Sequence, residues 1–261
     1  MNRQQTLEDF GKLLDIMDRL RVECPWDREQ TLDSLRTLTI EETYELSDAI
    51  LEKDLHEIAK ELGDILLHIV FYAKIGDEKQ AFDIDYVINH LCDKLIYRHP
   101  HVFGSVEADN AQKVIQNWEQ LKIKEKDGNK TVLSGVPKGL PALVKAYRVQ
   151  DKVRAVGFDW EERDQVWDKV QEEWGEFKAE WEKQDPDRME AEFGDMLFSL
   201  VNAARLYGIN PETALERTNR KFIKRFGYLE QQTIKKGISL KDMSLAQMDV
   251  IWEEAKKYDK E

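Results

Sequence analysis

At 261 residues, the chain is long enough for one large domain or for two domains of about 130 residues each. Its hydrophobic content of 41% is high enough for packed cores and excludes disorder for most of its length. The net charge of −13, without a dense run of Lys or Arg, argues against nucleic acid as a partner, whereas bound divalent cations would still admit small anions. Low counts of glycine (13) and proline (6) favour helices over strands.

The sequence also predicts a soluble, cytoplasmic protein that does not enter a membrane. Cys24 and Cys92 lack the spacing of a metal site, and two isolated thiols are typical of a reducing compartment. The first ten residues, MNRQQTLEDF, are polar and lack the apolar core of a signal peptide. The longest apolar stretch, around Ile65 to Ala73, is far shorter than a membrane span.

In the first part of the chain, apolar residues recur three and four positions apart, which predicts a series of helices. The first carries Leu13 to Leu20 and ends at Cys24-Pro25. The later helices are expected from about Leu32 to Leu51, from Asp54 to about Ile75 with Gly76 as the break, from an N-cap at Asp83 to a point before Pro100, and from an N-cap at Asp109 through Trp118 and Leu121.

The stretch from Asp127 to Pro141 contains three glycines and two prolines and is the best domain boundary. We therefore expect an N-terminal domain at 1–130 and a C-terminal domain at 131–261. After the boundary the same order of helices starts again. The expected helices cover Leu143 to Val153, a charged segment after Gly157, a segment after Asp185-Pro186-Asp187, a segment after Gly208 and Pro211, and Met243 to Lys257.

Five carboxylates occur twice at the same spacing, which indicates an internal duplication. Each residue of the first set recurs 131 positions later: Glu41, Glu42, Glu45, Glu61 and Asp64 become Glu172, Glu173, Glu176, Glu192 and Asp195. A solvated acidic helix face with ion pairs would explain one such set. A matched second copy favours a functional site instead.

The spacing places the carboxylates where they can share a cation. Residues three apart lie on one helix face, so Glu42 and Glu45 point the same way, as do Glu61 and Asp64. If the two helices pack antiparallel, these like charges meet and repel unless a cation such as Mg²⁺ joins them. Glu41 and Glu172 lie about 100° round the helix, where each would be either an outer ligand of the cation or a base that orients a water. Gly63 and Gly194, each just before the Asp, suggest a close approach between helices.

Two further patterns are also repeated. A Lys and an Arg one helical turn apart suit a phosphate chain, and they occur as Lys94 with Arg98 and as Lys221 with Arg225. A Trp four residues before a Lys occurs as Trp118 with Lys122 and as Trp252 with Lys256. The tryptophans are either core anchors or surfaces against which a nucleobase lies.

Other chemistries lack support in the sequence. None of the five histidines follows a Glu by three residues, which excludes a ferritin-like di-iron site. A phosphate-binding loop of the Walker type and a Gly-x-Ser-x-Gly elbow are both missing. His68 is expected to be a hydrogen-bonded core residue. His99 and His101 fit a structural loop better than a metal site.

At this point the motifs resemble those of a known family. EETYE with ELGD, and EEWGE with EFGD, resemble the signature of the all-α nucleoside triphosphate pyrophosphohydrolases. The tandem arrangement, with ECPWDREQT, YRHPHVFG and VGFDW, is similar to that of two-domain MazG proteins. The resemblance implies an all-α fold of two tandem helical domains, with four-helix-bundle-like cores formed on homodimerisation. It implies cleavage of NTPs and dNTPs between the α and β phosphates, with Mg²⁺, or Mn²⁺ in its place.

The resemblance also implies roles for single residues. In the C-terminal domain the metal ligands would be Glu173, Glu176, Glu192 and Asp195, with Lys221 and Arg225 on phosphates and Trp252 and Lys256 lining the nucleotide pocket. The N-terminal domain offers the same roles to Glu42, Glu45, Glu61, Asp64, Lys94, Arg98, Trp118 and Lys122. We favour the C-terminal domain because Arg217, Arg220 and Lys224 add positive charge there. Glu172 or Glu173 would help a water attack; the alternative is a non-catalytic module that binds nucleotide or Mg²⁺ to regulate a partner.

Overall fold

The computed structural model describes residues 2–106, 110, 114, 117–118, 121–122, 131–160, 162–235 and 237–259. Its contacts divide the chain into two compact units, Met1–Val106 and Glu107–Glu261. Every regular element among the described residues is a helix, which confirms the expected all-α fold. None of these helices has the length and the apolar character that crossing a membrane requires. Asp109 and residues 127–130 of the expected boundary lie outside the described part of the chain.

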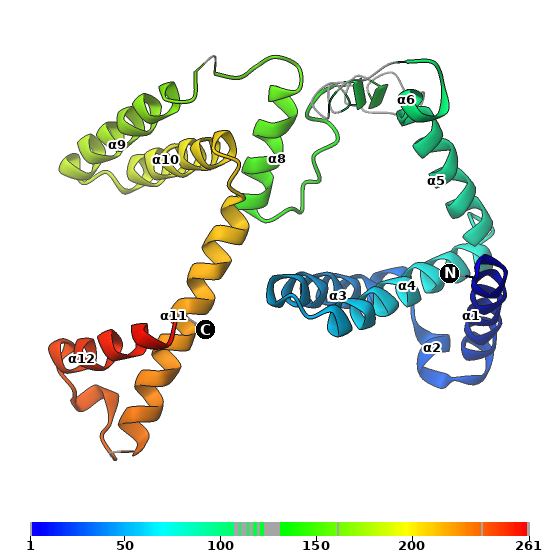
Figure 1. Ribbon diagram of the computed structural model, residues 1–261, viewed down its shortest axis with the longest axis horizontal. Coiled ribbons are helices and arrows are strands. Elements are labelled where there is room, and N and C mark those ends of the chain that lie inside the picture. Colours follow the sequence, from blue (N-terminus) through cyan, green and yellow to red (C-terminus); the bar gives the residue numbers. More distant parts are fainter. Residues whose placement is uncertain are drawn as a thin grey trace. The chain divides into compact units, whose positions relative to one another are not determined.

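The first unit is built from helices that follow the expected order (Figure 1). They are α1 (Arg3–Glu23), α2 (Pro25–Glu29), α3 (Leu32–Glu52), α4 (Leu55–Glu78), α5 (Ile84–Arg98) and α6 (Pro100–Phe103). The expected N-cap at Asp83 is present, because its side chain accepts a hydrogen bond from the backbone N–H of Tyr86. Asp54 caps α4 in the same way, by accepting from the backbone N–H groups of His56 and Glu57. Helices α3 and α4 lie side by side along their length.

The core of the first unit joins α1, α3 and α4. Its fully buried members are Met17, Leu35, Val70, Phe71 and Ile75. These residues repeat at helical spacing on α4, which turns one apolar face toward α1 and α3. The carboxylates of the first set are found between α3 and α4.

One expected break is wrong: Gly76 does not end the third helix. Helix α4 continues to Glu78, and Gly76 is buried within it. A Cβ atom at this position would lie 2.6 Å from the backbone oxygen of Phe82 and 2.7 Å from its ring. The glycine is therefore needed where the chain folds back against α4, and not as a helix terminator.

The close helix approach that was expected at Gly63 and Gly194 does not occur within the described part of either unit. A Cβ atom at either residue would meet no other atom within 4 Å among the described residues. Neither glycine is therefore required by a neighbouring helix of its own unit.

The second unit contains α8 (Ala142–Arg154), α9 (Gln165–Lys183), α10 (Pro186–Leu206), α11 (Pro211–Lys235) and α12 (Leu245–Ala255), with short 3₁₀ turns at Leu240–Asp242 and Lys256–Tyr258. Helices α9 and α10 lie side by side, while α11 extends from α8 to α12 (Figure 1). Buried hydrophobic residues occur on four of these helices: Val166, Val201, Ala203, Leu229, Ile251 and Ala255.

The two helix pairs are joined by the same kind of turn. Lys53 ends α3 in the left-handed conformation (φ 59°), and Gln184 ends α9 in the same way (φ 56°). An Asp follows each of them and caps the next helix: Asp54 before α4 and Asp185 before α10. This short turn forces each pair to be antiparallel and so fixes which positions face each other.

Candidate active site

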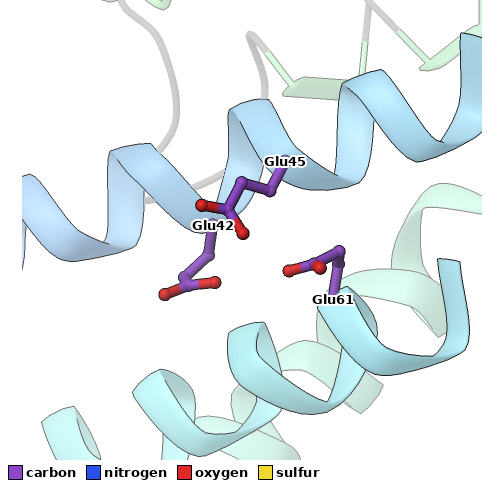
Figure 2. Close-up of side chains that lie close together, drawn as sticks. All are labelled: Glu42, Glu45 and Glu61. Atoms are coloured by element: carbon purple, nitrogen blue, oxygen red, sulfur yellow. The ribbon is translucent and has the colours of Figure 1, made fainter. Parts of the chain in front are cut away.

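The carboxylates of the first unit meet between α3 and α4. Figure 2 shows Glu42 and Glu45 on α3 turned toward Glu61 on α4. One oxygen from each of the three lies within 4.8 Å of the others, which is close enough to share one cation. Glu61 is only 3% exposed, and its Oε2 atom has no hydrogen-bond partner among the described residues. A buried carboxylate oxygen without a donor is costly unless a cation binds it.

The second unit repeats this arrangement between α9 and α10. Glu173, Glu176 and Glu192 each offer an oxygen within 4.8 Å of the other two. Glu173 is 6% exposed, so the most buried carboxylate is on the first helix of the pair here and on the second helix in the first unit. The duplicated sequence pattern thus produces the same three-carboxylate group twice.

Asp64 and Asp195 do not belong to these groups of three, although both act on them electrostatically. Partial burial, followed by the charge of Asp64 and the other glutamates, raises the pKa of Glu42 above its usual value. Burial and then the charges of Glu176 and Asp195 raise the pKa of Glu192 in the same way. Each group therefore concentrates negative charge that a divalent cation would relieve.

Two residues that the sequence reasoning missed join the second group. Lys169 lies one turn before Glu173 on α9, with its Nζ 2.6 Å from Glu173 and 3.0 Å from Glu172. Glu180 lies one turn after Glu176; its Oε2 is buried and has no hydrogen-bond partner among the described residues, and its charge acts on Glu192. Spacings of four residues from Glu173 and Glu176 would have revealed both.

A cavity opens beside the carboxylates of the second unit. It has a volume of about 570 Å³, which is in the range of small-molecule sites. Glu173, Asp195 and Lys169 line it, together with the apolar and aromatic side chains of Val149, Val153, Phe158, Trp160, Val166 and Phe198. A ligand in this cavity would thus touch charged and apolar walls at once.

The basic and aromatic residues predicted to contact a nucleotide in the second unit lie on α11, on α12 and just after α12. The ring centroids of Phe222 and Trp252 are 5.0 Å apart, and the Arg225 guanidinium carbon lies 5.6 Å from the Trp252 centroid. Arg225 Nε donates to Asp259 at 2.9 Å. Lys221 is exposed on the same helix, and Lys256 pairs with Glu253. These residues do not line the cavity beside Glu173.

The corresponding residues of the N-terminal half are Lys94, Arg98, Trp118 and Lys122. Lys94 and Arg98 lie one turn apart on α5, both half-buried. Lys122 Nζ lies 3.8 Å from the centroid of the Trp118 ring, so this repeated pair forms a cation–π contact. Trp118 and Lys122 fall in the second compact unit, whereas Glu42 belongs to the first.

His68 and His99 both make hydrogen-bonding contacts within the first unit. His68 is 7% exposed, and its Nδ1 shares a 2.8 Å hydrogen bond with Thr39 Oγ1, which confirms the expected core role. His99 follows the last residue of α5, and its Nδ1 lies 2.6 Å from the backbone oxygen of Leu95.

Comparison with known proteins agrees with the duplicated site. The profile of the MazG nucleotide pyrophosphohydrolase domain matches residues 30–103 and 162–228, so each match contains one carboxylate set. The chain is 44% identical to the nucleoside triphosphate pyrophosphohydrolase/pyrophosphatase MazG of Thermotoga maritima over 95% of each protein. It is 39% identical to the nucleoside triphosphate pyrophosphohydrolase of Escherichia coli K12, over 96% of this chain and 98% of that protein.

A third relative, the uncharacterized protein YabN of Bacillus subtilis, is 47% identical over 95% of this chain, which spans 52% of that protein. The double match, and identities of this size over nearly the full length, give the chain its family. It belongs to the MazG nucleotide pyrophosphohydrolases and carries the family's domain twice.

Proposed function

We propose that the chain is a nucleoside triphosphate pyrophosphohydrolase whose C-terminal unit cleaves NTPs and dNTPs between the α and β phosphates, giving a monophosphate and pyrophosphate. The observation that carries this proposal is the position of Glu173 and Asp195 in the wall of a nucleotide-sized cavity. The family description and the names of the relatives from Thermotoga maritima and Escherichia coli support the reaction.

The donor set fits a hard divalent cation. Glu173, Glu176 and Glu192 supply only carboxylate oxygens, which suit Mg²⁺, with Mn²⁺ as a substitute. The orphaned Glu61 oxygen of the first unit and the raised pKa of Glu192 both mark places where bound positive charge would relieve a cost. When bound, the cation would supply the positive charge that offsets the phosphate oxygens and activates a water.

The chain's own residues provide the remaining parts. Glu173 faces the cavity and is the better candidate for accepting the proton of the attacking water, since Glu172 is exposed and does not line it. Lys169 keeps part of the negative charge compensated before substrate arrives. Four further candidates do not line the cavity: Lys221, Arg225, Trp252 and Lys256. They can contact the phosphates or the base only if α11 and α12 of one copy of the chain approach the bound nucleotide.

Differences between the duplicated units favour the C-terminal one as the catalytic unit. Ser199 and Asn202 line its cavity. The residues 131 positions earlier are His68 and Phe71, which are larger and buried in the first unit. The first unit would then hold a cation, through Glu42, Glu45, Glu61 and Asp64, without a comparable space for a nucleotide. Lys94 and Arg98 would have no catalytic role.

We propose further that the protein is a homodimer. Exposed apolar residues form a row on α4 (Leu62, Leu66 and Ile69) and a matching row on α10 (Phe193, Leu197 and Leu200). Each of these six side chains is at least 38% exposed, and each row follows one helix face, which is unfavourable in water unless another surface covers it. A second copy presents the same rows, so the surfaces suit a self-complementary interface.

The proposed location of the protein is the cytoplasm. Both cysteines are free thiols, which is consistent with a reducing compartment.

The experiment incubates the protein with each NTP and dNTP and Mg²⁺ and identifies the products by ion-exchange chromatography. Monophosphate with pyrophosphate is the expected result. Diphosphate with orthophosphate would reject the proposed bond, and nucleotide binding without turnover would favour a regulatory module that does not catalyse.

A further inference from the structure

Beyond the carboxylates, the wall of the cavity contains a buried amide that the proposed chemistry does not use. Gln150, on α8, is 4% exposed and lines the cavity. Its Nε2 donates to the backbone oxygen of Phe198 at 2.8 Å, which fixes the orientation of the amide. Its Oε1 is buried and accepts no hydrogen bond from the described residues. A buried acceptor held in place without a donor suits a ligand that brings an N–H group.

The surroundings of Gln150 suit a flat aromatic ligand. Phe158 and Trp160 line the same cavity from the loop that precedes α9, and Phe158 is 79% exposed. Exposed aromatic faces beside a cavity offer stacking surfaces for a nucleobase. Most of the remaining wall is apolar, from Val149, Val153, Val166 and Phe198. The cavity thus combines stacking, apolar contact and one oriented polar group.

A partly buried ion pair holds the aromatic loop in place. Arg205, on α10, donates from Nη1 to Asp159 at 3.1 Å, and Asp159 lies between Phe158 and Trp160 in the chain. Arg205 also donates from Nε and Nη2 to Asn202 Oδ1 at 3.0 and 2.8 Å. The Asn202 amide is therefore oriented as well, with its Nδ2 as the remaining donor. These contacts preorganise the cavity wall before any ligand binds.

The first unit lacks this arrangement at the matching positions. Phe71 stands where the second unit has Asn202, and it is 2% exposed within the core. His68 stands in the place of Ser199 and is held by Thr39. The carboxylates at this place are duplicated, whereas the Asn202 amide that lines the cavity has no counterpart in the first unit.

The geometry points to a base-recognition subsite in the second unit, in which the base stacks on Phe158 or Trp160 and Gln150 Oε1 accepts an N–H of its hydrogen-bonding edge. This inference rests on the proposed hydrolysis, because the base enters this cavity only if the phosphates lie at Glu173. Adenine, guanine, cytosine, uracil and hypoxanthine each carry such an N–H. Analogues without one should be poor substrates, since they leave the buried oxygen unpaired.

The test compares kcat/KM for nucleotides of equal size within the base class that the protein hydrolyses fastest. Purine riboside triphosphate is compared with ATP, GTP and ITP, and pyrimidin-2-one riboside triphosphate with CTP and UTP. Neither analogue has an N–H on its pairing edge. We expect the wild type to prefer the best natural base by about tenfold or more. In Gln150→Met this preference should fall to about twofold or less, mainly through loss of activity on the natural base.

The control is Gln231→Met, at an exposed glutamine on α11, which should keep the wild-type preference. A structural role for Gln150 would lower kcat/KM equally for both nucleotides and leave the ratio intact, which would overturn the inference. Wild-type protein that hydrolyses the analogue as well as the natural nucleotide would overturn it too, even where Gln150→Met does not fold. If no nucleotide is hydrolysed at all, the proposed function fails instead.

Discussion

Lys169 Nζ lies 2.6 Å from a carboxylate oxygen of Glu173, one turn along α9, and both side chains line the cavity of the second unit. Its hydrogen bonds to Glu173 and Glu172 raise the pKa of Lys169 above its usual value, so the ammonium is charged at neutral pH. This lysine therefore offsets one negative charge of the group that we propose to bind Mg²⁺.

Replacing that lysine should strengthen metal binding. In Lys169→Met the carboxylates lose their internal cation, and the Mg²⁺ dissociation constant measured by calorimetry should fall by about three- to tenfold, which is the size expected for one charge near a partly exposed site. Lys178→Met removes the same charge from an exposed position on α9 and should change the constant little. Weaker metal binding in Lys169→Met would mean that the lysine holds Glu173 in its binding position.

Two glycines of α4 should respond in opposite ways to the same substitution. Gly76→Ala places a methyl group 2.6 Å from the Phe82 backbone oxygen and should lower the free energy of unfolding by about 1–3 kcal/mol. Gly63→Ala meets no atom within 4 Å and should raise it by up to about 1 kcal/mol, because alanine favours the helix. Urea unfolding measures both. A loss of stability in Gly63→Ala would indicate that a second copy packs against this glycine.

Gly76 also shows which part of the fold could not be predicted from the sequence. The order of the helices was predicted from the apolar spacing, and the cap at Asp83 was predicted because capping is a local interaction between a side chain and the turn that follows it. Gly76 was misread as a helix end. The contact that requires it comes from Phe82, beyond the end of the helix, and such a contact leaves no local pattern.

The site divides in the same way. Spacing on adjacent helices predicted that four carboxylates of each set meet, because a short turn fixes how the helices pair. Three of each set do so, and Asp64 and Asp195 lie outside these groups. Gln150 was not predicted, since its place in the cavity depends on how α8 packs on α10, and a single glutamine has no distinctive spacing. The position of Lys221 and Arg225 against α12 likewise depends on packing between distant segments.

The buried His68 should make the first unit sensitive to acid. Burial lowers the pKa of His68, and the nearby charge of Asp64 opposes this only in part, while Thr39 and Tyr72 supply neutral partners. Because the folded pKa lies below the unfolded one, the unfolded chain takes up the proton first, and stability is lost as the pH falls below about 6.5. We expect a smaller loss of unfolding free energy between pH 7.5 and 5.5 in His68→Gln than in the wild type, measured by urea titration.

The exposed His90 on α5 provides the matched control for this pH effect. His90→Gln should retain the wild-type difference between the two pH values. If His68→Gln and His90→Gln behave alike, the acid sensitivity does not come from the buried imidazole.

Asp259 should compete with phosphate for Arg225. The hydrogen bond from Arg225 lowers the pKa of Asp259, and the charges of Lys221 and Lys224 add to this, so the carboxylate is ionised at neutral pH. If Arg225 holds phosphates, Asp259→Asn should lower KM for the preferred nucleotide by about two- to fivefold, in keeping with the modest strength of partly exposed ion pairs. Steady-state kinetics with Asp242→Asn, at an exposed site, as the charge control checks this. An unchanged or higher KM would remove the phosphate role from Arg225.

The most direct test compares two matched substitutions, Glu173→Gln and Glu42→Gln, in a pyrophosphate-release assay with Mg²⁺. Both remove one negative charge at equal size from equivalent positions of the duplicated site. Glu173 faces the cavity of the second unit, and Glu42 does not. We therefore expect kcat/KM to fall by about 100-fold or more in Glu173→Gln and to stay within about threefold of the wild type in Glu42→Gln. Wild-type activity in Glu173→Gln, or its loss in Glu42→Gln alone, would contradict the assignment of catalysis to the C-terminal unit.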